Sequence, residues 1–203
     1  MSETIPLKAG AAHCALCFSV LADRLGVSSS SNALGGVPGG DALVALFVTW
    51  KKRNVDDGEW DLRGCIGNLS PIKLQGGLER YALISSLEDR RFSPVIAKEL
   101  PLLRCTVSLL VNFEDNKSAF DWQIGTHGII IDFTSGGRSY SGTYLPEVMP
   151  EQGWDHETAI RSLVRKSGYR GTVDAKLLSS ISLTRYQSSK YYMTFQEWAG
   201  GEE

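Results

Sequence analysis

The apolar positions of the chain follow two periods, one typical of helices and one typical of strands. Residues 13–25 carry apolar side chains at three- and four-residue spacing, which predicts an amphipathic helix that ends near Gly26. Its apolar positions are Cys14, Cys17, Phe18, Leu21 and Leu25. Residues 105–113 instead alternate between apolar and mostly polar side chains, which predicts a strand with one apolar face.

Further elements follow from short apolar runs and from turn and cap signals. Runs bounded by turn residues predict strands at 43–50, 60–66, 128–133, 139–145 and 181–186. Asp57-Gly58 and Ser135-Gly136-Gly137 lie between adjacent runs and predict two hairpins. Helix-start signals predict helices over 70–89, from Ser93 to before Pro101, and over 155–167. The Ser- and Gly-rich residues 28–40 predict a loop.

The order of these elements indicates the fold class. The strands come mostly in adjacent pairs rather than in regular alternation with helices. We therefore expect an α+β fold, a largely antiparallel sheet flanked by helices. A length of 203 residues fits a single domain over 1–203, built as one body or as two lobes that share a core.

Composition and charge narrow the classes of partner. The chain has 21 basic and 23 acidic residues, a net charge of −2, which offers no general attraction to nucleic acid or to an anionic membrane. The basic clusters Lys51-Lys52-Arg53 and Arg90-Arg91 are flanked by acids and are predicted to be solvated surface. The longest apolar run, 42–48, is too short to cross a bilayer, and no secretion signal is evident. We expect a soluble intracellular protein whose four cysteines are reduced thiols.

The segment Arg63-Gly64-Cys65-Ile66-Gly67 is the strongest candidate for chemistry. On a strand, Arg63 and Cys65 share a face and lie about 7 Å apart, so the guanidinium favours the thiolate. Gly64 and Gly67 leave backbone N–H groups open to a close-approaching group. Together these are the parts of a nucleophile or of an anion-binding site. The alternative, that Cys65 is a buried apolar filler beside a bulge, stays open.

A thiol nucleophile needs a base, and the chain has three histidines. His127 and His156 are the candidates, and Glu151 or Asp155 could orient one of them. An ordinary hydrogen-bonded role for each histidine stays open. His13 adjoins the pair Cys14 and Cys17, but helix periodicity explains both cysteines as core positions and no second ligand pair is evident. We predict no metal site and no cofactor.

Several motifs resemble the AMMECR domain family, named from the chromosomal region of Alport syndrome, midface hypoplasia and elliptocytosis. The resemblance rests first on 62–67, the hallmark Leu-Arg-Gly-Cys-Ile-Gly, and covers about residues 43–195. Further matching segments, in chain order, are 46–50, 109–115, 121–128, 143–148, 151–156 and 183–186. The Ser- and Gly-rich insert before Leu43 and the acidic end at Glu202-Glu203 depart from the family pattern.

The resemblance implies an α+β fold with two lobes of unequal size. The larger lobe would contain both termini, and the smaller would lie within about 68–105. Shared family residues gather around the motif at 63–67, which favours a site there. Bacterial and archaeal relatives look functionally linked to a Memo-type protein and to a radical-SAM protein. Some animal relatives look nuclear, so a cytoplasmic or nuclear location is expected.

Three hypotheses of function follow. The first is an enzyme that uses Cys65 as nucleophile or redox thiol in an interlobe cleft. The second is a non-catalytic module that binds a small molecule or a protein, such as a Memo-type partner, through Arg63, Gly64 and Gly67. The third, least favoured, is a nucleic-acid binder that uses the basic and aromatic segment 183–192.

Overall fold

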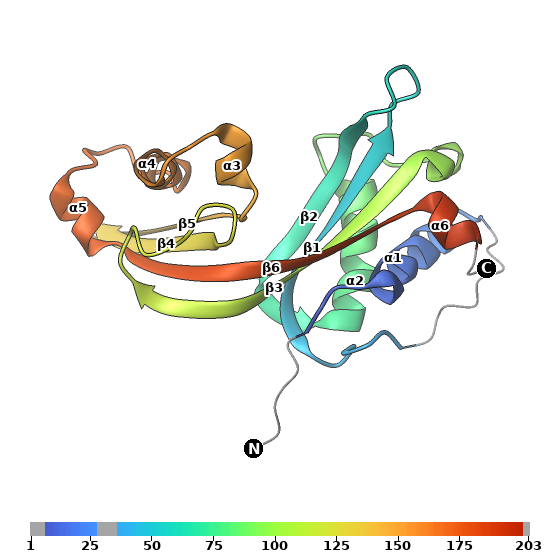
Figure 1. The fold of residues 1–203 in the computed structure, drawn as a ribbon, viewed down its shortest axis with the longest axis horizontal. Helices are drawn as coiled ribbons and strands as arrows, with labels where there is room; N and C mark the ends of the chain where they lie inside the picture. The colour runs from blue at the N-terminus through green and yellow to red at the C-terminus, as the bar shows by residue number, and fades with distance from the viewer. Residues whose placement is uncertain (1–6, 28–35, 201–203) are drawn as a thin grey trace. The chain divides into compact units, whose positions relative to one another are not determined.

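The structure is a computed structural model that describes residues 7–27 and 36–200. It has an α+β architecture around a six-stranded sheet with strand order β2-β1-β3-β6-β4-β5 (Figure 1). The strands are β1 (Leu43–Arg53), β2 (Trp60–Lys73), β3 (Leu103–Lys117), β4 (Gly128–Ser135), β5 (Arg138–Tyr144) and β6 (Ser182–Thr194). Strand β1 pairs antiparallel with β2 and β3, and β4 pairs antiparallel with β5 and β6. The predicted α+β class with a largely antiparallel sheet is confirmed.

Short helices accompany the sheet. They are α1 (Ala11–Arg24), α2 (Leu74–Leu83), α3 (Val148–Gln152), α4 (His156–Lys166), α5 (Ala175–Ser180) and α6 (Phe195–Gly200). A π-helical turn, η1 (Ile84–Glu88), continues α2, and a 3₁₀ helix, η2 (Ala97–Leu102), precedes β3. None of the helices in the described ranges is long and apolar enough to cross a membrane. Most of the loop predicted over 28–40 falls on residues 28–35, which lie outside the described residues.

Contacts between residues divide the chain into two compact units. The first unit comprises the residues up to Leu110 together with those from Ser189 onward, and the second comprises Val111–Ser188. Residues 68–105, where a smaller lobe was expected, belong to the first unit and contain the end of β2, α2, η1 and η2. Each unit buries its own apolar side chains.

Trp50 organises the core of the first unit. Its side chain is fully buried, its ring meets the edge of Phe18 from α1 at 5.0 Å, and its Nε1 donates to the carbonyl oxygen of Ala82 in α2 at 3.1 Å. One indole therefore joins β1 to both helices, which gives the buried N–H the partner that it needs. The predicted apolar face of α1 is confirmed, since Cys14, Cys17 and Phe18 are fully buried.

Two predicted helix starts in the first unit are wrong. Ser70-Pro71 lies inside β2, which continues to Lys73, and α2 begins only at Leu74. Ile72 pairs with Val44, and β2 lies at the end of the sheet order, where a strand tolerates a proline without an N–H. The helix predicted from Ser93 begins at Ala97 as a 3₁₀ helix and includes Pro101. At Ser70-Pro71 the pairing of β2 with β1 outweighs the local start signal.

The second unit follows the sequence pattern more closely. Gly136 and Gly137 both have positive φ, 58° and 75°, so they form the predicted two-residue turn between β4 and β5. Asp155 caps α4 by accepting a hydrogen bond from Thr158 N at 2.8 Å. The apolar face of α4 packs into a cluster with β4 residues. Helices α3 and α5 of this unit, and α6 of the first unit, are too short to show a period and were not predicted.

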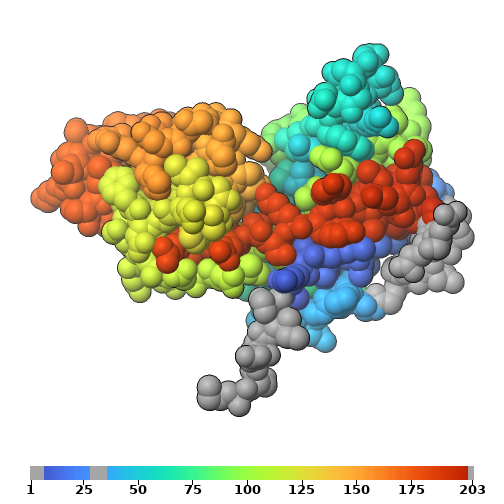
Figure 2. All heavy atoms as spheres, viewed as in Figure 1, coloured from blue at the N-terminus to red at the C-terminus, as the bar shows by residue number. Residues whose placement is uncertain are grey.

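The hairpin of β1 and β2 extends from the first unit (Figures 1 and 2). Its strands pair from Leu43 with Lys73 to Arg53 with Trp60, so the predicted hairpin is confirmed, and the register shifts between Val44 and Leu46 and between Trp50 and Lys51. Gly58 has φ 78°, and Glu59 N donates to Asp57 Oδ1 at 2.9 Å. The hairpin carries the candidate motif on β2, the strand at the edge of the sheet.

Adjacent glycines in α2 provide a test of its packing. A methyl group at Gly76 meets no atom within 4 Å, whereas one at Gly77 lies 2.8 Å from Ile72 Cδ1 and 2.9 Å from Leu46 Cδ2. We expect Gly76→Ala to raise the free energy of unfolding by about 0.5–1 kcal/mol through helix propensity. Gly77→Ala should be less stable than Gly76→Ala by about 1–3 kcal/mol because its methyl overpacks the core. Urea unfolding measures both, and equal values would contradict the packing of α2 on β1.

Candidate functional site

Strand β2 carries the motif, and a bulge distorts it at Arg63. Cys65 pairs with Thr49 and Gly64 with Trp50, but the next pair joins Leu62 to Lys51, so Arg63 is an extra residue. A bulge bends its strand and redirects a side chain. The simple alternation expected along 60–66 is therefore interrupted between Leu62 and Gly64.

The side chain of Arg63 is directed to Glu99 of η2. Its Nε and Nη2 donate to the two carboxylate oxygens at 3.2 and 3.0 Å, and Lys52 Nζ adds a third contact at 2.9 Å. The side chains of Arg63 and Glu99 are only 13% and 11% exposed. Burial alone would raise the pKa of Glu99, but the hydrogen bonds from Arg63, Lys52 and the Ile96 N–H lower it to about 2. Nη1 of Arg63 is buried and has no hydrogen-bond partner among the described residues.

At Gly64 and Gly67, other segments of the first unit lie close against the backbone of β2. A Cβ at Gly64 would overlap the carbonyl oxygen of Ser85 in η1, and one at Gly67 would overlap the ring of Phe47. Both positions therefore require glycine because other parts of the chain fill the space. The close approach that the sequence predicted is made here by backbone and ring atoms of the protein itself.

Cys65 is held by three polar contacts at three different atoms. Thr49 Oγ1 donates to Sγ at 3.1 Å, Cys65 N donates to Asp89 Oδ2 at 3.0 Å, and Arg91 Nη2 donates to the Cys65 carbonyl oxygen at 3.1 Å. Cys65 is half-buried, whereas Cys14, Cys17 and Cys105 are buried. The main chain on both sides of the thiol is thus fixed, and the sulfur has a hydroxyl donor.

Asp89 is the anion of this site. Its side chain is 4% exposed and accepts from Arg91 Nη2 at 2.7 Å, from Arg91 Nε at 3.0 Å and from Cys65 N. The hydrogen bond from Arg91, with those from the Cys65 and Arg91 N–H groups, holds the pKa of Asp89 far below its usual range against the opposing effect of burial. The pKa of Arg91 is raised by Asp89 and, more weakly, by charge on Cys65. Arg91 therefore favours an anion at the thiol.

The sequence located Cys65 but missed the residues that surround it. Arg90-Arg91 was interpreted as solvated surface, and both residues are exposed, but the ion pair of Arg91 with the buried Asp89 was not predicted. The one available signal was an acid two residues before an arginine after the predicted helix. Thr49 and Glu99 carried no signal, because their roles depend on β1 pairing and on the position of η2.

The two candidate histidines belong to the second unit and make ordinary hydrogen bonds there. His127 Nδ1 accepts from Gln123 N at 3.0 Å, and burial, followed by Arg185, lowers the pKa of His127. His156 Nε2 lies 3.0 Å from the Trp122 carbonyl oxygen, and its ring lies 4.4 Å from that of Trp122. Their assignment as bases for Cys65 stays a prediction.

The two predicted orienting acids also belong to the second unit. Asp155 caps α4, and the hydrogen bonds from Thr158 lower its pKa. Glu151 lies exposed in α3. Asp155 thus has a structural role, whether or not it also orients a histidine.

His13 and the other cysteines serve the core of the first unit. His13 is buried, accepts from Gly10 N at Nδ1 (3.0 Å) and lies 3.0 Å from the Pro38 carbonyl oxygen through Nε2. Cys14, Cys17 and Cys105 gather in the interior, where burial, then contact with the other two thiols, raises the pKa of Cys105. Within the described ranges, no group of three or more His, Cys, Asp or Glu side chains could hold a metal ion.

Segment 183–192, the candidate for nucleic-acid binding, contains an arginine that is paired with two carboxylates. Arg185 on β6 pairs with Glu114 and with Asp121, each at 2.8 Å. The pKa of Glu114 is lowered chiefly by its hydrogen bond to Arg185. An arginine that is paired in this way offers less charge to a phosphate.

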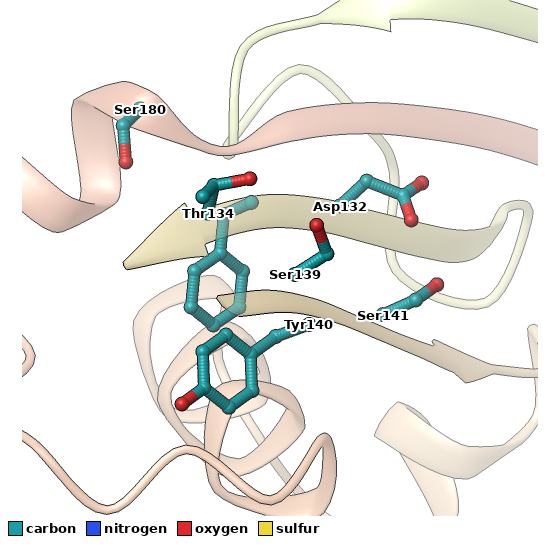
Figure 3. Close-up of a pocket in the computed structure, with 7 residues that line it drawn as sticks. Asp132, Thr134, Ser139, Tyr140, Ser141 and Ser180 are labelled. Atoms are coloured by element: carbon teal, nitrogen blue, oxygen red, sulfur yellow. The ribbon is translucent and has the colours of Figure 1, made fainter. Parts of the chain in front are cut away.

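Cavities occur in both units. In the first, a cavity of about 310 Å³ lies beside the bulge, lined by Lys52, Arg53, Asn54, Val55, Asp61, Leu62, Arg63 and Leu102. In the second, a hollow of about 550 Å³ lies over the β4–β5 hairpin. Figure 3 shows Asp132, Thr134, Ser139 and Ser141 on one side of this hairpin and the Tyr140 ring on the other. Both polar side chains and the aromatic residues Phe133 and Tyr140 line this second hollow.

The fold and the site together define an α+β protein whose edge strand presents a half-buried thiol in an Arg-Gly-Cys-Ile-Gly segment. The chain matches the AMMECR1 family model over residues 14–191 and belongs to that family. It is 52% identical over 155 residues to an uncharacterised protein of Arabidopsis thaliana, covering 75% of this chain and 72% of the relative. It is 38% identical over 175 residues to an uncharacterised protein of Saccharomyces cerevisiae, covering 76% and 70%.

A solved structure has the same fold. The crystal structure of an uncharacterised protein from Pyrococcus horikoshii superposes with a TM-score of 0.70 and 25% identity, over 94% of this chain and 92% of that one. The predicted family is therefore confirmed. The relatives named here bring no activity with them, so the function rests on the site.

Replacing Glu99 by Gln tests the ion-pair network. The ordinary pKa of 4.5 is lowered to about 2 on folding, so the charged form stabilises the fold above about pH 4.5, and this contribution is lost as the pH falls toward 2. The lowered pKa corresponds to about 3 kcal/mol at neutral pH. We expect Glu99→Gln to reduce the free energy of unfolding by about that amount at pH 7 and by much less at pH 3.

Urea unfolding of both proteins from pH 7 to pH 3 measures the difference. Glu157→Gln is the control, since its exposed pair with Arg161 should contribute less than about 1 kcal/mol. A Glu99→Gln deficit that is independent of pH would contradict the assignment.

Proposed function

We propose that this AMMECR1-family protein performs a thiol-dependent reaction in which Cys65 is the nucleophile or redox thiol. The observation that carries the proposal is the hydrogen bond from Thr49 Oγ1 to Cys65 Sγ, at the one cysteine of the chain that is not buried. A donor at sulfur lowers the free energy of the thiolate relative to the thiol. A buried apolar filler would neither need such a donor nor be half-exposed.

The charges near Cys65 support the same role. Arg91 reaches the Cys65 carbonyl oxygen, and its pKa responds to charge at the thiol. Asp89 neutralises part of this charge but is itself fixed by Arg91 and by Cys65 N. The result is a thiol on a rigid main chain, next to a guanidinium. In the first step the sulfur electron pair forms a bond to an electrophilic atom of the substrate. The bond from that atom to its leaving group breaks, the leaving group departs with the electron pair, and the thiol proton passes to solvent or to a base.

The sequence predicted that Arg63 would be the cation that favours the Cys65 thiolate. Arg63 is engaged with Glu99, so Arg91 takes the place of the cation beside the thiol. His127 or His156 stays the proposed base, with Glu151 or Asp155 to orient it. The substrate is a small molecule or a protein with an electrophilic centre.

Alkylation by iodoacetamide tests the proposal. The sulfur forms a bond to carbon, iodide leaves with its electron pair, and the thiol proton passes to solvent. We expect Cys65 in the native protein to react at pH 7 at least as fast as N-acetylcysteine, and Thr49→Val to slow this reaction by about three- to ten-fold. Mass spectrometry of peptides identifies the modified cysteine, and Cys65→Ala is the blank.

The buried cysteines serve as internal controls, because Cys14, Cys17 and Cys105 should react only in denaturant. If Cys65 also reacts only in denaturant, or if Thr49→Val changes nothing, the thiol has no chemical role. Thr49→Val keeps the shape of the side chain, and its unfolding curve shows whether the fold is intact.

A binding module is the second candidate, favoured by the unpartnered Nη1 of Arg63 and the cavity beside it. A ligand with an acceptor oxygen would satisfy this buried donor. A Memo-type protein, the partner that the family resemblance suggests, is the first to test by pull-down with purified proteins. Arg63→Lys should abolish such binding, since lysine lacks the fork of donors, and should leave alkylation of Cys65 unchanged.

A further inference from the structure

A groove in the second unit has a different character from the Cys65 site. It has a volume of about 870 Å³ and is lined by residues of α4 and of the loop that leads to α5. Its lining residues are Trp154, Thr158, Arg161, Ser162, Arg165, Arg170, Gly171, Thr172 and Val173. Three of these nine are arginines and none is acidic. Small-molecule sites have volumes of about 300–1,000 Å³, so the groove is of suitable size.

The helical period explains how α4 builds one wall. Thr158, Arg161, Ser162 and Arg165 are spaced i, i+3, i+4 and i+7, so they share one face of the helix. The opposite face, which includes Ile160 and Leu163, is buried in the core of the unit. Core packing therefore fixes the rotation of α4 and holds the two arginines toward the groove.

Backbone carbonyls anchor both of these arginines. Arg161 Nη1 donates to the Val173 carbonyl oxygen at 2.7 Å, and Arg165 Nη1 donates to the carbonyl oxygens of Gly171 and Tyr169 at 2.7 and 3.3 Å. These contacts position each guanidinium and tie the loop to α4. A carbonyl carries no net charge, so the positive charge is kept.

The charges in the groove are only partly compensated. Arg161 pairs with Glu157 at 2.9 Å, whereas Arg165 and Arg170 form no ion pair with any residue that the structure describes. Asp155 and Asp174 lie nearby in sequence but cap α4 and α5. Two unpaired guanidiniums that line one groove, Arg165 from α4 and Arg170 from the loop, attract an anion, and their planar donors match the oxygens of a phosphate.

Trp154 adds an aromatic surface to this cationic groove. It is half-buried, and its ring lies 5.7 Å from that of Tyr144 at 58°. Thr158 and Thr172 add hydroxyl donors to the lining. An indole next to guanidiniums suits a ligand that has a planar ring and an anionic group.

We propose that this groove binds a phosphorylated small molecule that carries an aromatic ring. Arg165 and Arg170 would hold the phosphate, and Trp154 would contact the ring. This site is independent of Cys65 and of the thiol chemistry proposed above.

Isothermal titration calorimetry with ADP as the probe tests this site. We expect saturable binding at low ionic strength, weaker binding of inorganic phosphate, and at least a ten-fold loss of ADP affinity in Arg170→Gln and in Arg165→Gln. Trp154→Phe should weaken ADP binding but leave phosphate binding unchanged. Arg138→Gln is the matched control, since Arg138 is an exposed arginine of the same unit that does not line the groove.

Three outcomes would overturn the proposal. They are no saturable binding of ADP at millimolar concentration, an equal loss in Arg138→Gln, and phosphate binding as tight as ADP binding. Arg165 also anchors the loop, so its variant could alter the fold. Arg170 has no such contact among the described residues, and Arg170→Gln decides in that case.

Discussion

The geometry of the motif at residues 63–67 depends on the hydrogen bonds that the buried carboxylate of Asp89 accepts. A carboxylate in a nearly closed environment is unfavourable unless donors surround it. Here the donors are the guanidinium and N–H of Arg91 and the N–H of Cys65. These contacts connect the segment after η1 to the edge of the sheet and leave Cys65 little freedom. The main chain at Cys65 is therefore held by a charge that lies 24 residues later in the chain.

The same constraint explains the glycines. If Asp89 is to reach Cys65 N, η1 must lie against β2, and the carbonyl oxygen of Ser85 then occupies the space above Gly64. Any side chain at Gly64 would move η1 away and separate Asp89 from its donors. Glycine at this position is thus required by packing between two segments of one unit. A hallmark motif can owe its residues to such contacts as much as to a ligand.

The sequence predicted helices and strands whose signals lie within each segment. It did not predict contacts between residues that are far apart in the chain. The helix at 13–25 and both hairpins were predicted because their periods and turn residues lie within each segment. Ser70-Pro71 misled because the signal for a helix start says nothing about β1, whose Val44 pairs with Ile72. Cys65 was located from its motif. Its partner Thr49 and the partner of Arg63, Glu99, lie 16 and 36 residues away, and no local pattern identifies such pairs.

Comparison of the arginines shows which of them can receive a ligand. Arg63 donates through Nε and Nη2 to a buried carboxylate, so its charge is already matched, and only Nη1 can serve a further acceptor. Arg165 is anchored by carbonyl oxygens, which leave its charge uncompensated. An arginine paired with a carboxylate stabilises a fold, whereas one fixed by neutral acceptors is pre-organised for an anion without first breaking an ion pair. This criterion favours the groove beside α4 for the proposed anion site, and it leaves the motif region to the proposed thiol chemistry.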